Sequence, residues 1–276
     1  MPDSREQGLT HPVTQTLPGL KPPRFQALRT IAALTLREMS STYGRSPGGY
    51  VWAVLQPVAA IMVLALAFSL VLRAPSLGNS FILFYATGYL PFTLYGAMAG
   101  KLAAALRYSK PLLAYPRVTW IDAILSRLIL NLLTNAMVLL IVIGGILWFT
   151  DARATLDPGP IMSGAGLAAA VGIGVGLMNC LLIGLYPLWG QVWAIVSRPL
   201  FLASGIFFIY EDMPSLVQDI LWWNPILHAV GEMRRGFYAT YEASYVSLSF
   251  GYGAAGMLTL FGLLFLRRYH KKVLEN

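Results

Sequence analysis

Long apolar stretches, separated by short charged segments, dominate the chain. A helix that crosses a membrane needs about 20 consecutive apolar residues. Uncharged stretches of this length or more extend over 46–72, 74–100, 128–150, 158–197 and 243–266. The pattern predicts an all-α integral membrane protein with six transmembrane helices. The predicted spans cover about 50–72, 80–100, 120–148, 161–185, 190–210 and 247–266.

The uncharged stretch over 158–197 is too long for one helix and must break in its second half. Pro187 and Gly190 supply the break, because proline cannot continue a helix and glycine weakens one. A fifth span is therefore predicted from about residue 190 to 210, with Arg198 in its first half. We expect the Arg198 side chain to reach toward the cytoplasmic headgroups.

Basic residues are unevenly distributed over the predicted loops. The 276 residues are 57% hydrophobic and 12% charged, and the net charge is +8. With six spans and both termini in the cytoplasm, all but four of the 20 Lys and Arg residues lie on the cytoplasmic side. This bias supports six spans over five. Topology thus accounts for the excess positive charge, and no nucleic-acid partner is expected. The four exceptions are Arg73, Arg153, Arg234 and Arg235.

Three predicted cytoplasmic segments flank the first two spans. Residues 1–24 are expected to form a mobile tail, and no apolar signal-peptide core precedes the first span, which should act as an uncleaved anchor. Residues 25–42 have the periodicity of an amphipathic helix, which lies in the membrane interface or simply leads into the span. The basic loop 101–118 suits either a cytoplasmic partner protein or anionic lipids.

The outer segment 211–246 is apolar in part, but it is too short and too charged to span. Asn224 followed by Pro225 is a helix-start pair, with a capping side chain before proline at the first helical position. Two short helices that meet at Trp223 and Asn224 are therefore predicted. We expect them to dip into the outer leaflet as re-entrant elements, which is tolerated where backbone is buried in protein or lines a cavity.

No pattern in the sequence indicates catalysis or a metal site. The segment 96–102 resembles a phosphate-binding loop only faintly, because its spacing is short and Leu102 replaces the hydroxyl residue that holds Mg²⁺. The single cysteine, Cys180, and three dispersed histidines argue against a metal centre. Gly172 and Gly176 fit close packing between helices.

Several segments together resemble the ABC-2-type permeases, and more narrowly the KpsM/Wzm class of capsule and O-antigen polysaccharide exporters. The similarity extends over about residues 25–272, and the outer segment and the tail favour the KpsM side. The similar segments are Arg37-Glu38, Tyr43-Gly44-Arg45-Ser46, Gly49-Tyr50-Val51-Trp52-Ala53 and Gln56-Pro57 before and within the first span, Pro214, Trp223-Asn224-Pro225-Ile226 and Arg234-Arg235-Gly236-Phe237-Tyr238 in the outer segment, and the tail Phe265-Leu266-Arg267-Arg268-Tyr269.

This resemblance implies a homodimer in the bacterial inner membrane that works with two copies of a separate ABC ATPase. The ATPase would bind ATP and Mg²⁺, so this chain would bind no cofactor and would not itself be an enzyme. The cargo would be a lipid-linked, acidic capsular polysaccharide, passed to periplasmic and outer-membrane export proteins. Within a single transmembrane domain over 25–272, the implied parts are an interface helix at 25–45, a coupling loop at 101–118 and an outer gate at 211–246.

Candidate site residues follow from these roles, because aromatic faces bind sugars and arginine binds carboxylated sugars. For each aromatic, lipid contact or packing inside the protein is the alternative, and for the two outer arginines it is pairing with Glu211, Asp212 or Glu232. Arg45 would meet the phosphate of the lipid linker, with helix capping or headgroup contact as equal alternatives. The channel or gate candidates are Trp52, Tyr85, Tyr89, Tyr95, Trp222, Trp223, Arg234, Arg235, Phe237, Tyr238 and Tyr241, and those for ATPase coupling are Lys101, Leu102, Leu106, Arg107 and Lys110.

Other functions stay open from the sequence. One is a sibling permease that exports a neutral O-antigen or a teichoic acid, and another is an ABC-2 exporter of drugs or small lipids. A third, from a different class, is a membrane enzyme that acts on a lipid-linked sugar. Such an enzyme needs acids clustered at one interface, and Glu211, Asp212 and Asp219 are the one cluster in the sequence.

Overall fold

The computed structural model describes residues 26–43, 48–113, 118–150 and 154–275, and every regular element among them is a helix. Within these residues, five helices are long and apolar enough to cross a membrane. The chain is therefore a multi-pass membrane protein. These helices are α2 (Gly49–Ser69), α3 (Phe81–Ala103), which continues almost directly into α4 (Ala105–Leu113), α5 (Trp120–Phe149), α6 (Pro158–Leu185) and α10 (Leu248–Glu275).

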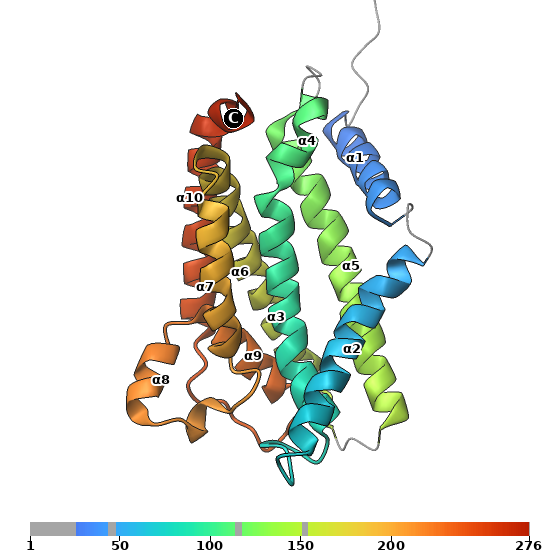
Figure 1. The fold of residues 1–276 in the computed structure, drawn as a ribbon, viewed down its shortest axis with the longest axis vertical. Coiled ribbons are helices and arrows are strands. Elements are labelled where there is room, and N and C mark those ends of the chain that lie inside the picture. Colours follow the sequence, from blue (N-terminus) through green and yellow to red (C-terminus); the bar gives the residue numbers. More distant parts are fainter. Residues whose placement is uncertain (1–25, 44–47, 114–117, 151–153, 276) are drawn as a thin grey trace, which may run out of the picture.

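The long helices form a bundle in which α6 packs against α3 on one side and α10 on the other. In Figure 1, α3 runs through the middle, with α2 and α5 to its right and α6, α7 and α10 to its left. One end of the bundle carries α1 (Gln26–Tyr43), α4 and the end of α10. The opposite end carries α8 (Ser215–Leu221) and α9 (Pro225–Arg235).

Glycines on α6 permit the close approach of its neighbours. A Cβ atom at Gly172 would lie 2.6 Å from the Tyr95 carbonyl oxygen of α3, and one at Gly176 would lie 2.8 Å from a side chain of the same helix. On another face of α6, a Cβ at Gly174 would lie 2.8 Å from a side chain of α10. Real Cβ atoms do not make such contacts, so glycine is required here. The predicted small-residue packing of Gly172 and Gly176 is confirmed.

The segment predicted as the fifth of six spans forms only a short helix. As predicted, the chain breaks after α6, and α7 (Trp189–Leu202) begins there. Its 14 residues extend about 21 Å, less than the apolar thickness of a bilayer, about 30 Å. The chain is not helical over 203–209, where Gly205 has a φ of +78°, a left-handed conformation that suits glycine. Six crossings and cytoplasmic termini stay predictions.

The outer segment contains the two short helices that the sequence predicts. They are α8 and α9, separated by residues 222–224. The Asn224 side chain accepts a hydrogen bond from the Ile226 backbone N–H at 3.0 Å, and Pro225 occupies the first position of α9. The predicted helix start is therefore confirmed, whereas the depth of these helices in the membrane stays a prediction.

Candidate functional site

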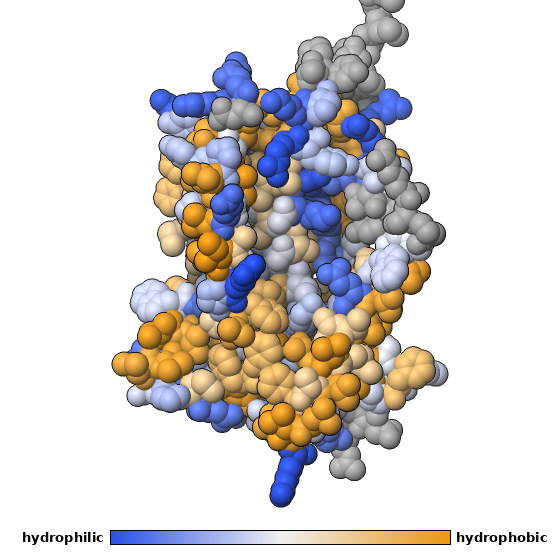
Figure 2. Space-filling model, in the orientation of Figure 1, coloured by the Kyte–Doolittle hydropathy of each residue, from blue (hydrophilic) through white to orange (hydrophobic). Residues whose placement is uncertain are grey.

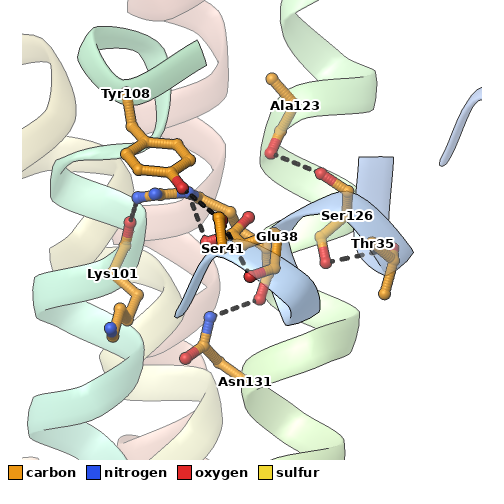
Figure 3. A network of polar contacts seen from close by, with 9 residues as sticks. Thr35, Glu38, Ser41, Lys101, Tyr108, Ala123, Ser126 and Asn131 are labelled. Atoms are coloured by element: carbon orange, nitrogen blue, oxygen red, sulfur yellow. Dashed lines mark hydrogen bonds and ion pairs between the residues drawn. The ribbon is translucent and has the colours of Figure 1, made fainter. Parts of the chain in front are cut away.

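A buried polar network joins four helices at the end of the bundle that carries α1 and α4 (Figure 3). Arg127 of α5 forms an ion pair with Glu38 of α1, with 2.9 Å between Nε and Oε1. Its Nη1 donates a hydrogen bond to the Lys101 carbonyl oxygen near the end of α3, also at 2.9 Å. The guanidinium lies 4.1 Å from the ring centre of Tyr108 on α4. One arginine thus contacts α1, α3 and α4 from α5.

Arg127 and Glu38 are both nearly buried, so each charge needs the other as its partner. The side chains of Arg127 and Glu38 are 5% and 8% exposed. Burial raises the pKa of the Glu38 carboxyl, and the charges of Arg127 and Lys101 oppose that shift. A second link, 2.6 Å between the hydroxyls of Ser41 and Tyr108, connects α1 directly to α4. The network therefore fixes α1 against the junction of α3 and α4.

This network was missed in the sequence interpretation, although two signals for it exist. Arg127 is a charged residue within a predicted span, and Glu38 is the one acid in the predicted amphipathic helix. A charge at membrane depth usually has a partner inside the protein. Nothing in the spacing of the two residues, 89 positions apart, indicates that they pair.

The predicted coupling residues come together on the α3–α4 junction. Leu102 and Leu106 are buried in a core cluster, whereas the side chains of Lys101, Arg107 and Lys110 are exposed. The junction therefore has an apolar face toward the bundle and a cationic face away from it. Its role in coupling stays a prediction, and the predicted loop continues into 114–117, which lie outside the described residues.

Two adjoining pockets form a groove along α3, between α2 and α5 on one side and α7 on the other; we call it the α3 groove. The pockets have volumes of about 500 and 440 Å³ and share Phe92, Gly96 and Phe201. Figure 2 shows a pale to blue strip between the positions of α7 and α5, with apolar surface to its left and below it. Aromatic and polar side chains both line the groove. They include Gln56, Tyr89, Thr93 and Asn135 in one pocket and Tyr95, Trp193, Ser197 and Arg198 in the other.

The adjacent outer arginines have different surroundings. Arg234 is buried, and its guanidinium donates hydrogen bonds to the carbonyl oxygens of Phe208 and Ile206 at 2.8 and 3.1 Å. Arg235 is 44% exposed and pairs with Glu232 at 3.2 Å. Arg234 thus attaches α9 to the non-helical segment after α7, and of the two side chains only that of Arg235 reaches the surface.

The acids of the outer segment are partly engaged with neighbouring side chains. Glu211 lies in the short 3₁₀ helix η1 (Tyr210–Asp212) and accepts a hydrogen bond from the Tyr241 hydroxyl at 3.1 Å. Asp219 lies on α8. In the part of the chain that the structure describes, no three His, Cys, Asp or Glu side chains are grouped to hold a metal ion.

The aromatic candidates do not gather at one place. Two line the α3 groove, others are packed inside the chain, and others are exposed, so their roles in transport stay predictions. Arg45 lies outside the described residues. Tyr89 and Tyr95 line the groove, Tyr85, Phe237, Tyr238 and Tyr241 are buried, Trp222 is partly buried and donates to the Tyr245 carbonyl oxygen, and Trp52 and Trp223 are 61% and 70% exposed.

A comparison with protein families matches residues 29–238 to the model described as ABC-2 type transporter. The match covers most of the chain and includes the polar network and the whole α3 groove. The chain belongs to the ABC-2 type transporter family. The polar network and the α3 groove are therefore features of an ABC-2 membrane protein.

Curated relatives match this ABC-2 protein over nearly its full length. The polysialic acid transport protein KpsM of Escherichia coli is 26% identical over 90% of this chain and 96% of its own length. The capsule polysaccharide export inner-membrane protein BexB of Haemophilus influenzae is 26% identical over 89% of this chain and 92% of its own. The capsule polysaccharide export inner-membrane protein CtrC of Neisseria meningitidis serogroup B is 24% identical, with the same coverage.

Proposed function

We propose that this chain is the membrane permease subunit of an ATP-driven exporter that moves a capsular polysaccharide across the bacterial inner membrane. The observation that carries the proposal is its similarity to named capsule polysaccharide exporters over about nine tenths of both chains. The α3 groove supports it, because sugar chains suit a groove that combines aromatic faces with amide and hydroxyl groups. The cargo is lipid-linked and acidic in this proposal.

A separate ABC ATPase supplies the energy and holds ATP and Mg²⁺. The exposed cations on the α3–α4 junction offer it a docking surface, beside α1. Movement of that surface reaches the groove through Arg127, because this side chain binds α3 and the ring of Tyr108 on α4 while it pairs with α1. In this role α3 is the moving part, since it forms a wall of the α3 groove.

The working unit is a homodimer with two ATPase subunits. The α3 groove is open along one side in a single chain, so a second copy would close it into a channel. Both termini lie in the cytoplasm, and α7 with the segment after it completes a sixth crossing. Helices α8 and α9 enter the outer leaflet and gate the exit toward periplasmic and outer-membrane export proteins. The distribution of the basic residues supports this orientation.

Co-purification tests the central part of this proposal. The tagged chain is expressed with candidate ABC ATPase subunits and purified in detergent, and the mass of the complex is measured. We expect a complex of two chains and two ATPases. Reversing the cations of α4 with Arg107→Glu and Lys110→Glu should release the ATPase, whereas Arg267→Glu and Lys271→Glu on α10 should not.

If no ATPase co-purifies with the unaltered chain, the transporter proposal is wrong. If one co-purifies and its ATP hydrolysis responds to drugs but not to glycolipids, the drug-exporter alternative replaces the polysaccharide cargo.

A further inference from the structure

One cation opens on the α3 groove without an acidic partner among the residues that the structure describes. Arg198 lies on α7 and is exposed, in the groove wall that also contains Trp193 and Ser197. Neither of the ion pairs found among the described residues involves it. The structure places this side chain in the wall of the groove, and its predicted reach toward the headgroups stays a prediction.

Arg198 faces α3, a helix of span length, across its pocket. The opposite wall of its pocket is formed by residues 92–100 of α3, which continues to Ala103. At 1.5 Å per residue, Tyr95 to Gly100 lie about 5–12 Å before that end of the helix. They lie within α3, one of the helices that are long and apolar enough to cross a membrane. A charged side chain that faces a cavity between such helices is expected to bind a partner there.

Two glycines, which have no side chain to fill the pocket, form part of the wall opposite Arg198. A Cβ atom at Gly96 or Gly100 would have no atom within 4 Å, unlike one at Gly172 or Gly176. The two glycines of α3 therefore pack closely against none of the described residues, although glycine is unfavourable within a helix. They leave open space in the pocket that Arg198 lines.

We propose that Arg198 binds a carboxylate of an acidic sugar chain within the α3 groove, while Trp193 packs against a sugar ring. The proposal rests on the export function proposed above and assigns its cargo to the carboxylated polysaccharides. Guanidinium binds carboxylate through two parallel hydrogen bonds, which a flexible polymer can exchange from one sugar to the next. Charge complementarity supports it, since the relative KpsM is named for transport of polysialic acid.

The test uses the complete complex of this chain and its ATPase in nanodiscs of phosphatidylcholine. The probes are labelled polysialic acid oligomers and neutral dextran oligomers of the same length, and their binding is measured by fluorescence anisotropy. The unaltered complex should bind the acidic oligomer at least tenfold more tightly than the neutral one. Arg198→Ala should remove that difference, and Arg198→Lys should retain part of it. Arg267→Ala, an exposed arginine of α10, is the matched control and should change neither affinity.

Three outcomes would overturn the assignment. If Arg198→Ala binds the acidic oligomer as tightly as the unaltered chain, and the oligomer still stimulates ATP hydrolysis, the assignment is wrong and the export function stands. If neither oligomer binds or stimulates hydrolysis, the export function fails as well. If Arg198→Ala leaves binding of both sugars unchanged but reduces retention of phosphatidylglycerol in a parallel set of nanodiscs that contain this lipid, Arg198 is a headgroup anchor. Arg198→Gln, which keeps the length of the side chain, replaces the alanine variant if the latter does not fold.

Discussion

Arg127 and Glu38 are nearly buried, so each needs the other. A buried charge that loses its partner is strongly destabilising, typically by about 3–5 kcal/mol, whereas replacing both charges by apolar groups is often neutral. Glu38→Ala should therefore lower the thermal unfolding midpoint in detergent markedly. Glu38→Leu combined with Arg127→Met should lower it much less than the sum of the single changes.

Glu275→Ala, which removes an exposed acid near the end of α10, is the control for loss of a negative charge. Additive losses in the double variant would contradict the interpretation of the ion pair, because independent residues do not couple.

Local chemistry explains which residue roles could be predicted. The Asn224 cap was predictable because its acceptor and donor lie two positions apart. The burial of Arg234 was not, because its two acceptors lie 26 and 28 positions earlier in a segment without regular structure. The sequence does not distinguish the two adjacent arginines. Arg234 is buried and Arg235 is exposed because of the residues that surround each of them in the fold.

At the scale of elements, apolar runs of span length predicted five long helices, and their ends are close to those observed except that α10 continues nine residues past its predicted end. The segment after α7 shows the limit of this signal. Hydropathy indicates which residues avoid water, but it does not show whether they face lipid or the interior of the protein. Ser204 and Ile206 are fully buried in protein, where Arg234 binds the backbone, so their uncharged sequence does not indicate a membrane helix.

A closely packed glycine on α6 and a glycine on α3 that faces open space should change stability in opposite directions when each is replaced by alanine. Gly176→Ala places a methyl group 2.8 Å from a side chain of α3, and overpacking of this kind costs about 1–3 kcal/mol. Gly96→Ala meets no atom within 4 Å and gains helix propensity, about 1 kcal/mol. We expect the thermal unfolding midpoint to fall for Gly176→Ala and to stay unchanged or rise for Gly96→Ala.

The bulkier Gly96→Leu separates folding from transport. It should keep the folded complex, because it enters open space, and reduce export, because it narrows the α3 groove. Full export by this variant would show that cargo does not pass in front of Gly96.

For the whole molecule, the polar network and the α3 groove are connected by one helix. The network holds α3 at the Lys101 carbonyl, and the groove begins within one turn of that residue, at Gly100. A change in the position of α1 or α4 must therefore displace the wall of the groove or break the network. In the function proposed above, this connection would carry movement of the ATPase docking surface to the α3 groove.

ATP-driven transport by the purified complex tests the account most directly. The chain and its ATPase are reconstituted in proteoliposomes with the ATPase outward, and lipid-linked polysialic acid is added with ATP. Polymer that enters the lumen is protected from a glycosidase added outside. We expect protection that requires ATP and is lost in Glu38→Ala reconstituted at equal complex content. ATP hydrolysis without any ATP-dependent protection of the polymer would contradict the account.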